Sequence, residues 1–93
     1  MKYKIKQLTK RNDYRFMQYD FAIKNGFNLN DYETTYEGEI NLNSNINNTL
    51  EDLFYIFNVE RPEDFHGHSL STSDVVELDG INYYCDWAGW KKL

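Results

Sequence analysis

The stretch Val75-Val76-Glu77-Leu78-Asp79-Gly80-Ile81-Asn82-Tyr83-Tyr84-Cys85 decides the fold of this chain. Residues 75–78 and 81–85 are rich in β-branched and aromatic residues, which favour strands. Asp79-Gly80 between them is one of the strongest short signals for a two-residue hairpin turn. The sequence therefore predicts an antiparallel hairpin near the C-terminus, and residues 87–90 beyond it are predicted to form a last edge strand.

An amphipathic helix is predicted ahead of this hairpin. Leu50, Leu53, Phe54 and Phe57 are spaced at i, i+3, i+4 and i+7, so they form one apolar face. Thr49 precedes them and is predicted as the N-cap. The resulting helix is short, at about ten residues, and therefore depends on tertiary packing.

The segment between this helix and the hairpin is predicted to be a turn followed by a polar connection. Pro62 suits the first position of a single turn over residues 61–65. Residues 66–74 are rich in serine and histidine, and such side chains bond to nearby backbone groups and fix a loop.

The first half of the chain has the same alternation of strand and helix. Residues 3–8 alternate apolar and polar in period two, which predicts a strand. Its lysines are predicted to face solvent, where lysine also discourages pairing at a sheet edge. These lysines are Lys2, Lys4 and Lys6.

A first helix is predicted over residues 13–25. Asn12-Asp13 offers an N-cap, and Gly26 offers a C-terminal stop. Residues 31–40 then predict a second strand, and the asparagine-rich residues 41–48 predict a loop.

The predicted element order is β-α-β-α-β-β, with the edge strand following. Strands and helices in this order define the α+β class. We expect one small domain over residues 1–93, with two short helices packed on an antiparallel or mixed sheet.

Composition is that of a small folded domain. The 93 residues are 41% hydrophobic and 17% aromatic, which is enough for one core and argues against disorder. No apolar run approaches the roughly 18–20 residues of a membrane span, and no apolar stretch follows the N-terminal lysines as in a signal peptide. A single cysteine, Cys85, allows no internal disulfide. We therefore expect a cytoplasmic protein.

The net charge of −5 is unevenly distributed. Residues 1–15 carry six Lys or Arg against one Asp, a net of +5, whereas residues 16–90 carry two against 14 acids, a net of −12. Such an acidic body disfavours direct binding to nucleic acid, because phosphate contacts dominate that affinity. It suits a protein partner with a basic surface, although solubility alone also explains it.

Few residues could support catalysis or metal binding. His66, His68, Cys85 and Asp86 are the only plausible metal ligands, but they lack the paired spacing of a structural zinc site. Cys85 is predicted in mid-strand, where cysteine is usually a small buried hydrophobe. The sequence therefore predicts no catalytic residue, no metal and no cofactor.

Large aromatic residues cluster near the C-terminus. Trp87 and Trp90 follow Tyr83-Tyr84, and a chain this small cannot bury every one of them. These aromatics are either part of the core or a partner-binding surface, since such residues are enriched at interface hot spots. Dimerisation through the edge that carries Trp87 and Trp90 is a further prediction.

Residues 61–76, RPEDFHGHSLSTSDVV, resemble the YodL-like domains of Firmicutes. The pattern of that family runs R-P-x-D-F-x-G-H-S-L-S-x-S-D-V-V. Its continuation Y-Y-x-D-x-x-G followed by an aromatic residue is similar to residues 83–90. Trp87-Ala88, Trp90 and the asparagine-rich loop depart from the pattern, and the first half of the chain matches it loosely. Seven positions that match are polar residues or glycine: Asp64, Gly67, His68, Ser69, Ser71, Ser73 and Asp74.

The resemblance implies a protein of mobile genetic elements, such as conjugative elements, plasmids and prophages, with no catalytic activity attached. Small acidic proteins of such elements are frequently inhibitors of host defence, anti-CRISPR proteins among them. For the matching polar positions we predict a structural role, with Ser73 or Asp74 accepting backbone N–H bonds that fix the loop.

The sequence thus predicts a non-enzymatic protein-binding domain that blocks the basic surface of a host defence nuclease, of anti-CRISPR or anti-restriction type. Direct nucleic-acid and membrane binding are not expected. The alternatives are a regulator of a cell-shape or cytoskeletal target and, last, a His/Cys metal or thiol enzyme. The predicted partner-binding residues are acids and two tryptophans: Glu37, Glu39, Asp64, Asp74, Glu77, Asp86, Trp87 and Trp90.

Overall fold

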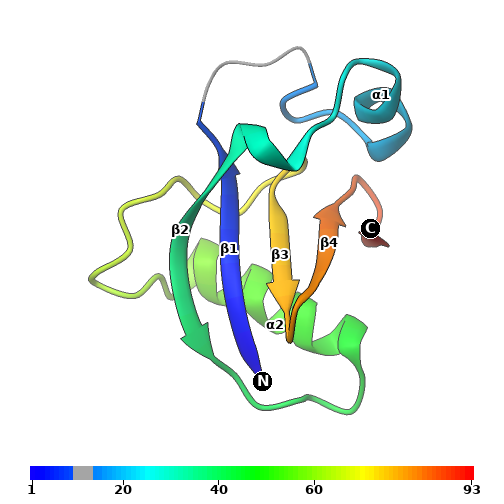
Figure 1. The fold of residues 1–93 in the computed structure, drawn as a ribbon. Coiled ribbons are helices and arrows are strands. Elements are labelled where there is room, and N and C mark those ends of the chain that lie inside the picture. The colour runs from blue at the N-terminus through cyan, green and yellow to red at the C-terminus, as the bar shows by residue number, and fades with distance from the viewer. Residues whose placement is uncertain (10–13) are drawn as a thin grey trace.

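The computed structural model describes residues 1–9 and 14–93, which form an antiparallel sheet and two helices (Figure 1). The strand order across the sheet is β2-β1-β3-β4-β5. This arrangement is α+β as predicted, and every strand pair is antiparallel. The elements are β1 (Lys2–Leu8), α1 (Tyr19–Lys24), the 3-10 turn η1 (Leu29–Asp31), β2 (Tyr32–Glu39), α2 (Ile46–Val59), β3 (Val75–Leu78), β4 (Ile81–Cys85) and β5 (Trp90–Lys92).

The predicted hairpin is present as β3 and β4. Val75 pairs with Tyr84 and Leu78 with Ile81, so the connection has two residues. Asp79 and Gly80 both have positive φ, at 45° and 86°, as a type I′ turn requires. An edge strand is also present, since β5 pairs with β4 at the rim of the sheet, but it spans Trp90–Lys92 and not the predicted residues 87–90, because residues 86–89 form a turn.

Strand β1 alternates as predicted, with Tyr3 and Ile5 buried beneath α2. Its position in the sheet differs from the prediction, because β1 lies between β2 and β3 and its lysines therefore protect no edge. Gly38 of β2 stands directly opposite Tyr3. A Cβ at Gly38 would lie 2.6 Å from the Tyr3 hydroxyl, so the tyrosine ring occupies the space of the missing side chain.

Helix α2 starts earlier than predicted. Its N-cap is Asn45, whose side-chain oxygen accepts a 2.8 Å bond from the Asn48 amide, and not Thr49. Thr49 is buried inside the helix and donates its hydroxyl to the Asn45 carbonyl. Part of the predicted loop is therefore the first helical turn, and α2 has 14 residues. Leu50 belongs to the buried face, together with Leu53 and Phe57, whereas Phe54 is 37% exposed.

Helix α1 is much shorter than predicted. The proposed cap at Asn12-Asp13 lies outside the described residues. Residues 14–16 form a turn, and Phe16 has a φ of 67° that no helix allows. The predicted stop is confirmed, since Gly26 has a φ of 85° and the Phe27 amide bonds to Ala22 O at 2.9 Å.

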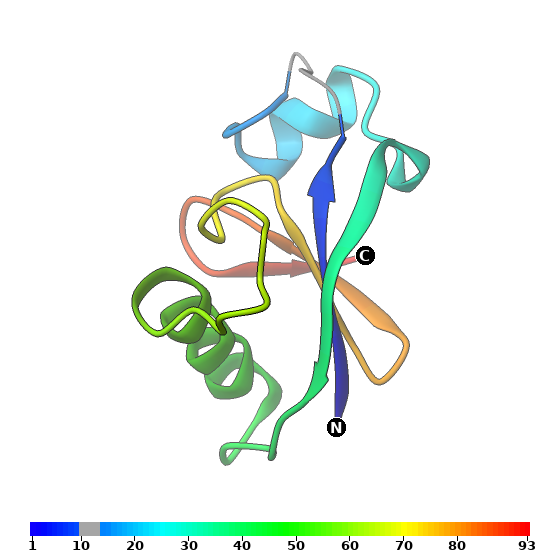
Figure 2. The same ribbon diagram turned by 90° about the vertical axis from the view of Figure 1, so that its left-hand side faces the viewer.

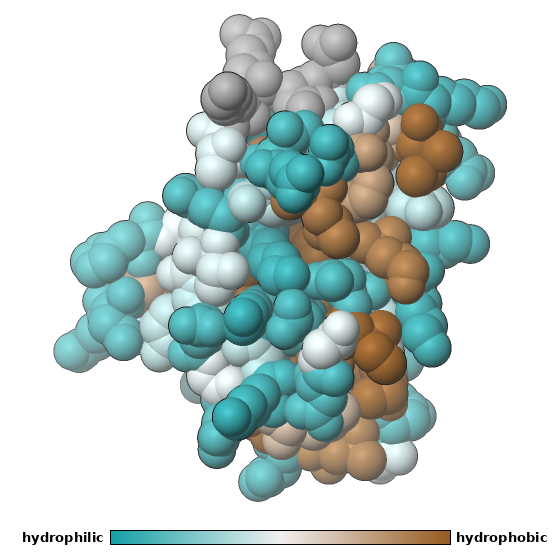
Figure 3. Space-filling model, viewed as in Figure 1, coloured by the Kyte–Doolittle hydropathy of each residue, from teal (hydrophilic) through white to brown (hydrophobic). Residues whose placement is uncertain are grey.

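The two faces of the sheet are covered to different extents (Figure 2). Helix α2 and the loop that follows it cover one face and enclose the main core, which includes Ile5, Leu53, Phe57 and Val76. Helix α1 covers only one end of the opposite face, where Tyr14 and Tyr84 are buried. The rest of that face is open, and hydrophilic residues predominate over β2 and β1 (Figure 3). Neither helix in the described part of the chain has the length and hydropathy needed to cross a bilayer.

Candidate functional site

The loop over residues 61–74, here called the motif loop, is organised around the buried carboxylate of Asp74. Asp74 is 2% exposed. Its Oδ2 accepts bonds from the Ser71 amide at 2.8 Å and from Gln7 Nε2 at 3.2 Å, while Oδ1 lies 3.6 Å from His68 Nε2. The side chain of Gln7, on β1, also donates to His68 O at 2.8 Å. Asp74 therefore connects the motif loop to the centre of the sheet.

Burial makes this carboxylate harder to ionise. Desolvation raises the pKa of Asp74 to about 6, although nearby His68, the Ser71 amide and Gln7 act in the opposite direction. Every bond that Asp74 makes is internal. The predicted role of Asp74 as a partner contact is therefore wrong, because the side chain is enclosed by its own fold.

The serines of the motif loop connect it to other elements. Ser73 Oγ accepts a 3.0 Å bond from the Phe16 amide, and the Ser73 carbonyl accepts a 2.6 Å bond from the Tyr32 hydroxyl. Ser71 Oγ donates to the Ser69 carbonyl within the loop at 2.8 Å. The prediction that Ser73 and Asp74 accept backbone N–H bonds is confirmed. The presence of Ser71, Ser73 and Asp74 in the motif is therefore explained by the bonds that fix the loop.

Gly67 is required by close packing in the motif loop. A Cβ at this position would meet the side chain of Gln7, and it would lie 2.8 Å from the Phe65 ring. His68 beside it is held by its Nδ1, which lies 2.7 Å from the Ser69 carbonyl. This bond agrees with the prediction that the side chains of residues 66–74 bond to nearby backbone groups and fix the loop.

A second tight turn, over residues 86–89, follows β4. The Asp86 amide bonds to Gly89 O at 3.0 Å, and Gly89 has a φ of 88° that favours glycine. Asp86 Oδ1 accepts bonds from the Trp87 amide at 2.8 Å and from the Tyr19 amide at 3.1 Å. Asp86 thus caps the first turn of α1, although it lies near the other end of the chain. Its second oxygen, Oδ2, forms no hydrogen bond with the described residues.

This turn and α2 enclose a hollow of about 200 Å³, here called the aromatic hollow. Three aromatic side chains and two acids line it. Phe54 and Trp90 meet edge to face, with ring centroids 6.5 Å apart and an interplanar angle of 81°. Trp87 is 61% exposed, and its indole Nε1 donates a 3.0 Å bond to the Phe16 carbonyl. The residues of the hollow are Glu51, Phe54, Cys85, Asp86, Trp87, Gly89 and Trp90.

The aromatic hollow lies in a negative local field. Cys85, one of its lining residues, is 4% exposed. Burial raises the pKa of the Cys85 thiol to about 12, and the negative charges of Asp74, Glu51 and Asp86 add to the increase. Two lining carboxylates therefore act on the same atom, and no Lys or Arg of the described residues lines the hollow.

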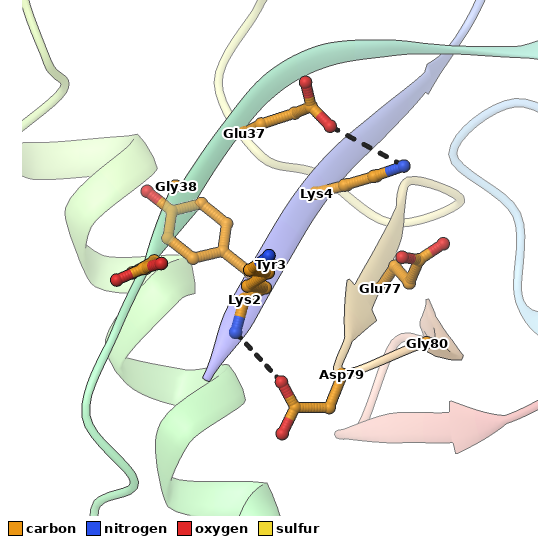
Figure 4. Close-up of a pocket in the computed structure, with 9 residues that line it drawn as sticks. Lys2, Tyr3, Lys4, Glu37, Gly38, Glu77, Asp79 and Gly80 are labelled. Carbon is orange, nitrogen blue, oxygen red and sulfur yellow. Dashed lines mark hydrogen bonds and ion pairs between the residues drawn. The ribbon is translucent and has the colours of Figure 1, made fainter.

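The open sheet face has a larger depression, of about 470 Å³, in which acids and lysines alternate (Figure 4). Glu37 lies 3.6 Å from the Lys4 ammonium, and Glu77 lies 2.9 Å from the ammonium of Lys6. Lys6 also donates to Asn82 Oδ1 at 2.9 Å. The acids of this face that were predicted to bind a partner are thus already opposite lysines of β1.

Of the remaining predicted acids, Glu39 lines the same depression and Asp64 lies in the motif loop. Glu39 is exposed at the end of β2, opposite Lys2 in the strand register. Asp64 is exposed in the motif loop, where it accepts a 3.0 Å bond from the Tyr36 hydroxyl. The structure brings Asp86, Trp87 and Trp90 together at the aromatic hollow and leaves the other predicted residues elsewhere.

Sequence reasoning missed the contributions of Glu51, Phe54 and Phe16 to this surface. Phe54 was predicted in the core, yet it lies at the rim of the buried face of α2 and contacts Trp90. Its i+4 spacing from Leu50 signals a helix face but not how wide the buried part of that face is. For Glu51 the sequence did contain a signal. It follows Leu50 directly, so its side chain must project near the edge of the buried face of the helix.

Neither a cluster of metal ligands nor an exposed thiol is present among the described residues. Among residues 1–9 and 14–93, no group of three or more His, Cys, Asp or Glu side chains could hold a metal ion. Cys85 is buried and its pKa is far above neutral, so thiolate is scarce at pH 7.

Fold and site together define a small α+β domain with an aromatic and acidic surface hollow and with a motif loop that is fixed by the buried Ser73 and Asp74. The chain belongs to the YodL-like domain family, whose model matches residues 2–93. No curated protein and no solved structure matches it.

Proposed function

We propose that this protein is a non-enzymatic protein-binding domain that occupies the basic surface of a nucleic-acid enzyme, such as a host defence nuclease of CRISPR or restriction type. The observation that carries the proposal is the presentation of Trp87. Its side chain is 61% exposed on a tight turn, and its indole is oriented by the 3.0 Å bond to the Phe16 carbonyl.

A fixed, exposed tryptophan is suited to anchor a partner. Tryptophan is enriched among the few interface residues whose truncation costs about 2 kcal/mol or more. Because the bond to Phe16 already restricts the indole, less conformational entropy is lost when a partner covers it. Phe54, which is 37% exposed and lines the same hollow, extends the apolar surface beside Trp87.

Charge supports a basic partner. The chain has a net charge of −5, and the aromatic hollow contributes two acids with no lysine or arginine of the described residues among its lining. Opposite charge across an interface accelerates association and selects against acidic partners. The basic groove in which a nuclease binds nucleic acid has the complementary sign, so its occupation would inhibit cleavage.

Affinity capture from host lysate, followed by a cleavage assay with the purified captured enzyme, tests the proposal. We expect the wild-type protein to enrich a nucleic-acid enzyme and to inhibit its cleavage. We expect Trp87→Ala to reduce both by at least about tenfold, the effect of losing a contact of about 1.4 kcal/mol. Tyr55→Ala is the matched control, because Tyr55 is a 53% exposed aromatic on α2 outside the aromatic hollow.

The outcomes separate the alternatives. If the capture enriches a cytoskeletal or cell-shape protein and no nuclease, the proposed partner is wrong and the protein binds that other class of target. Equal losses for Trp87→Ala and Tyr55→Ala, with both variants folded by circular dichroism, would overturn the assignment of the surface.

A further inference from the structure

We propose that the aromatic hollow is a receptor for a single arginine side chain of the partner. This inference rests on the proposed protein-binding function and specifies the chemistry that the partner must present. It is carried by the conjunction of three aromatic side chains and two carboxylates around one small opening.

The size of the hollow limits its occupant. About 200 Å³ is less than the roughly 300 Å³ at which pockets for drug-sized ligands begin. It accommodates one extended side chain. The opening lies between α2, which supplies Glu51 and Phe54, and the segment from Asp86 to Trp90.

The aromatic lining favours a cation with an apolar stem. Trp90 and Phe54 pack edge to face and both line the hollow, so an incoming side chain contacts both rings. The face of tryptophan is the strongest aromatic site for a cation, and arginine is the cation found there more often than lysine. The methylene stem of arginine can pack on the same rings.

The carboxylates supply the opposite charge. Glu51 is exposed on α2, and no ion pair or hydrogen bond within the described residues engages its side chain. Asp86 uses Oδ1 for the two backbone amides of its turn and of α1, which leaves Oδ2 for an external donor. A guanidinium presents several N–H donors in a planar fork and can therefore bond to a carboxylate while stacked on a ring.

Three cations of the described residues lie near these segments in the chain. Lys91 of β5 sits 5.9 Å from the centre of the Tyr19 ring, and Arg15 sits 5.4 Å from the centre of the Phe16 ring. Lys92 lines a neighbouring pocket that shares Trp90, and none of the three lines the aromatic hollow. The negative field there is thus not neutralised by a lining Lys or Arg of the described residues.

Nuclear magnetic resonance titration with acetyl-Gly-Arg-Gly-amide tests the proposal directly. The chain has two tryptophans, so its two indole N–H signals report on Trp87 and Trp90 without interference. We expect saturable shifts of these signals with the arginine peptide and weaker binding of the lysine analogue. The citrulline analogue, which has the same shape without the charge, should cause no saturable shift.

Two matched variants locate the charge. Glu51→Gln should weaken peptide binding about threefold, as expected for loss of one exposed ion pair. Glu60→Gln removes an equal charge about 13 Å further along the helix axis and should leave binding unchanged. Equal shifts with citrulline, stronger binding of lysine, or equal effects of the two variants would overturn the arginine assignment.

The result is separable from that for the proposed function. If partner capture depends on Trp87 but the arginine peptide does not bind, the receptor inference is wrong and the protein-binding function stands. If the peptide binds but no nucleic-acid enzyme is captured, the arginine receptor stands and the proposed partner class is wrong.

Discussion

The open sheet face and the aromatic hollow both carry acids, but they hold them in opposite ways. On the sheet face, Glu37 and Glu77 lie opposite lysines of β1, at 3.6 and 2.9 Å. In the hollow, Glu51 and Asp86 line one opening with three aromatic side chains, and no Lys or Arg of the described residues lines it. The number of acids in a segment therefore says less about partner binding than whether the fold has already paired them.

The buried Asp74 is the extreme case of an acid used by its own fold, and its removal has the largest expected effect. Asp74→Ala would leave the Ser71 amide without its acceptor and would remove one of the acceptors of Gln7 Nε2, which keeps its bond to His68 O. We expect a loss of about 3 kcal/mol in the free energy of unfolding, because buried polar groups without partners are costly. Urea unfolding followed by tryptophan fluorescence measures it.

Asp74→Asn is the control for this prediction. Its side-chain oxygen can accept both bonds, and its amide can face His68 Nε2, so the loss should stay within about 1 kcal/mol. If alanine and asparagine destabilise the protein equally, the role of Asp74 as an internal acceptor is contradicted.

Asp74 also makes the free energy of unfolding depend on pH, and this effect is expected to be smaller than that of Asp74→Ala. Since burial raises the pKa of folded Asp74 to about 6, the folded protein binds this proton more tightly than the unfolded chain. The contribution of this carboxyl to stability therefore increases as pH falls through 6 toward the unfolded value. Relative to Asp74→Asn, the wild type should gain on the order of 1 kcal/mol between pH 7.5 and 5. A constant difference across that range would contradict the prediction.

Pairing on the sheet face predicts the smallest effect on stability. Glu77→Gln keeps an oxygen near Lys6 and removes only the charge from a half-buried pair, so we expect a loss of about 0.5 kcal/mol. The indole signals of Trp87 and Trp90 should not move, since Glu77 does not line the aromatic hollow. Thermal unfolding and the indole spectrum of this variant check both statements.

Local signals were sufficient to predict most of the fold. Asp79-Gly80 fixed the hairpin, and both residues have the positive φ that this turn needs. The N-cap of α2 is Asn45 and not the predicted Thr49, because the asparagine-rich segment resembles a loop when its side-chain bonds are unknown. The start of α1 could not be predicted locally, since its first amide is capped by Asp86 from 67 positions away.

The candidate site was predicted in part. Asp86, Trp87 and Trp90 lie within five residues of one motif and line the same hollow, whereas Glu51 joins them only because α2 packs beside that turn. The pairing of Glu37 and Glu77 and the burial of Asp74 depend on strand order and loop path. Neither is encoded in spacing along the chain.

The affinity of the captured partner for wild type, Glu51→Gln and Glu37→Gln, determined by isothermal titration calorimetry, tests the central claim most directly. Loss of the unpaired acid in the aromatic hollow should weaken binding about fivefold, and loss of the paired acid on the sheet face should change it less than about twofold. Equal weakening by both variants, or a larger effect of Glu37→Gln, would contradict the account.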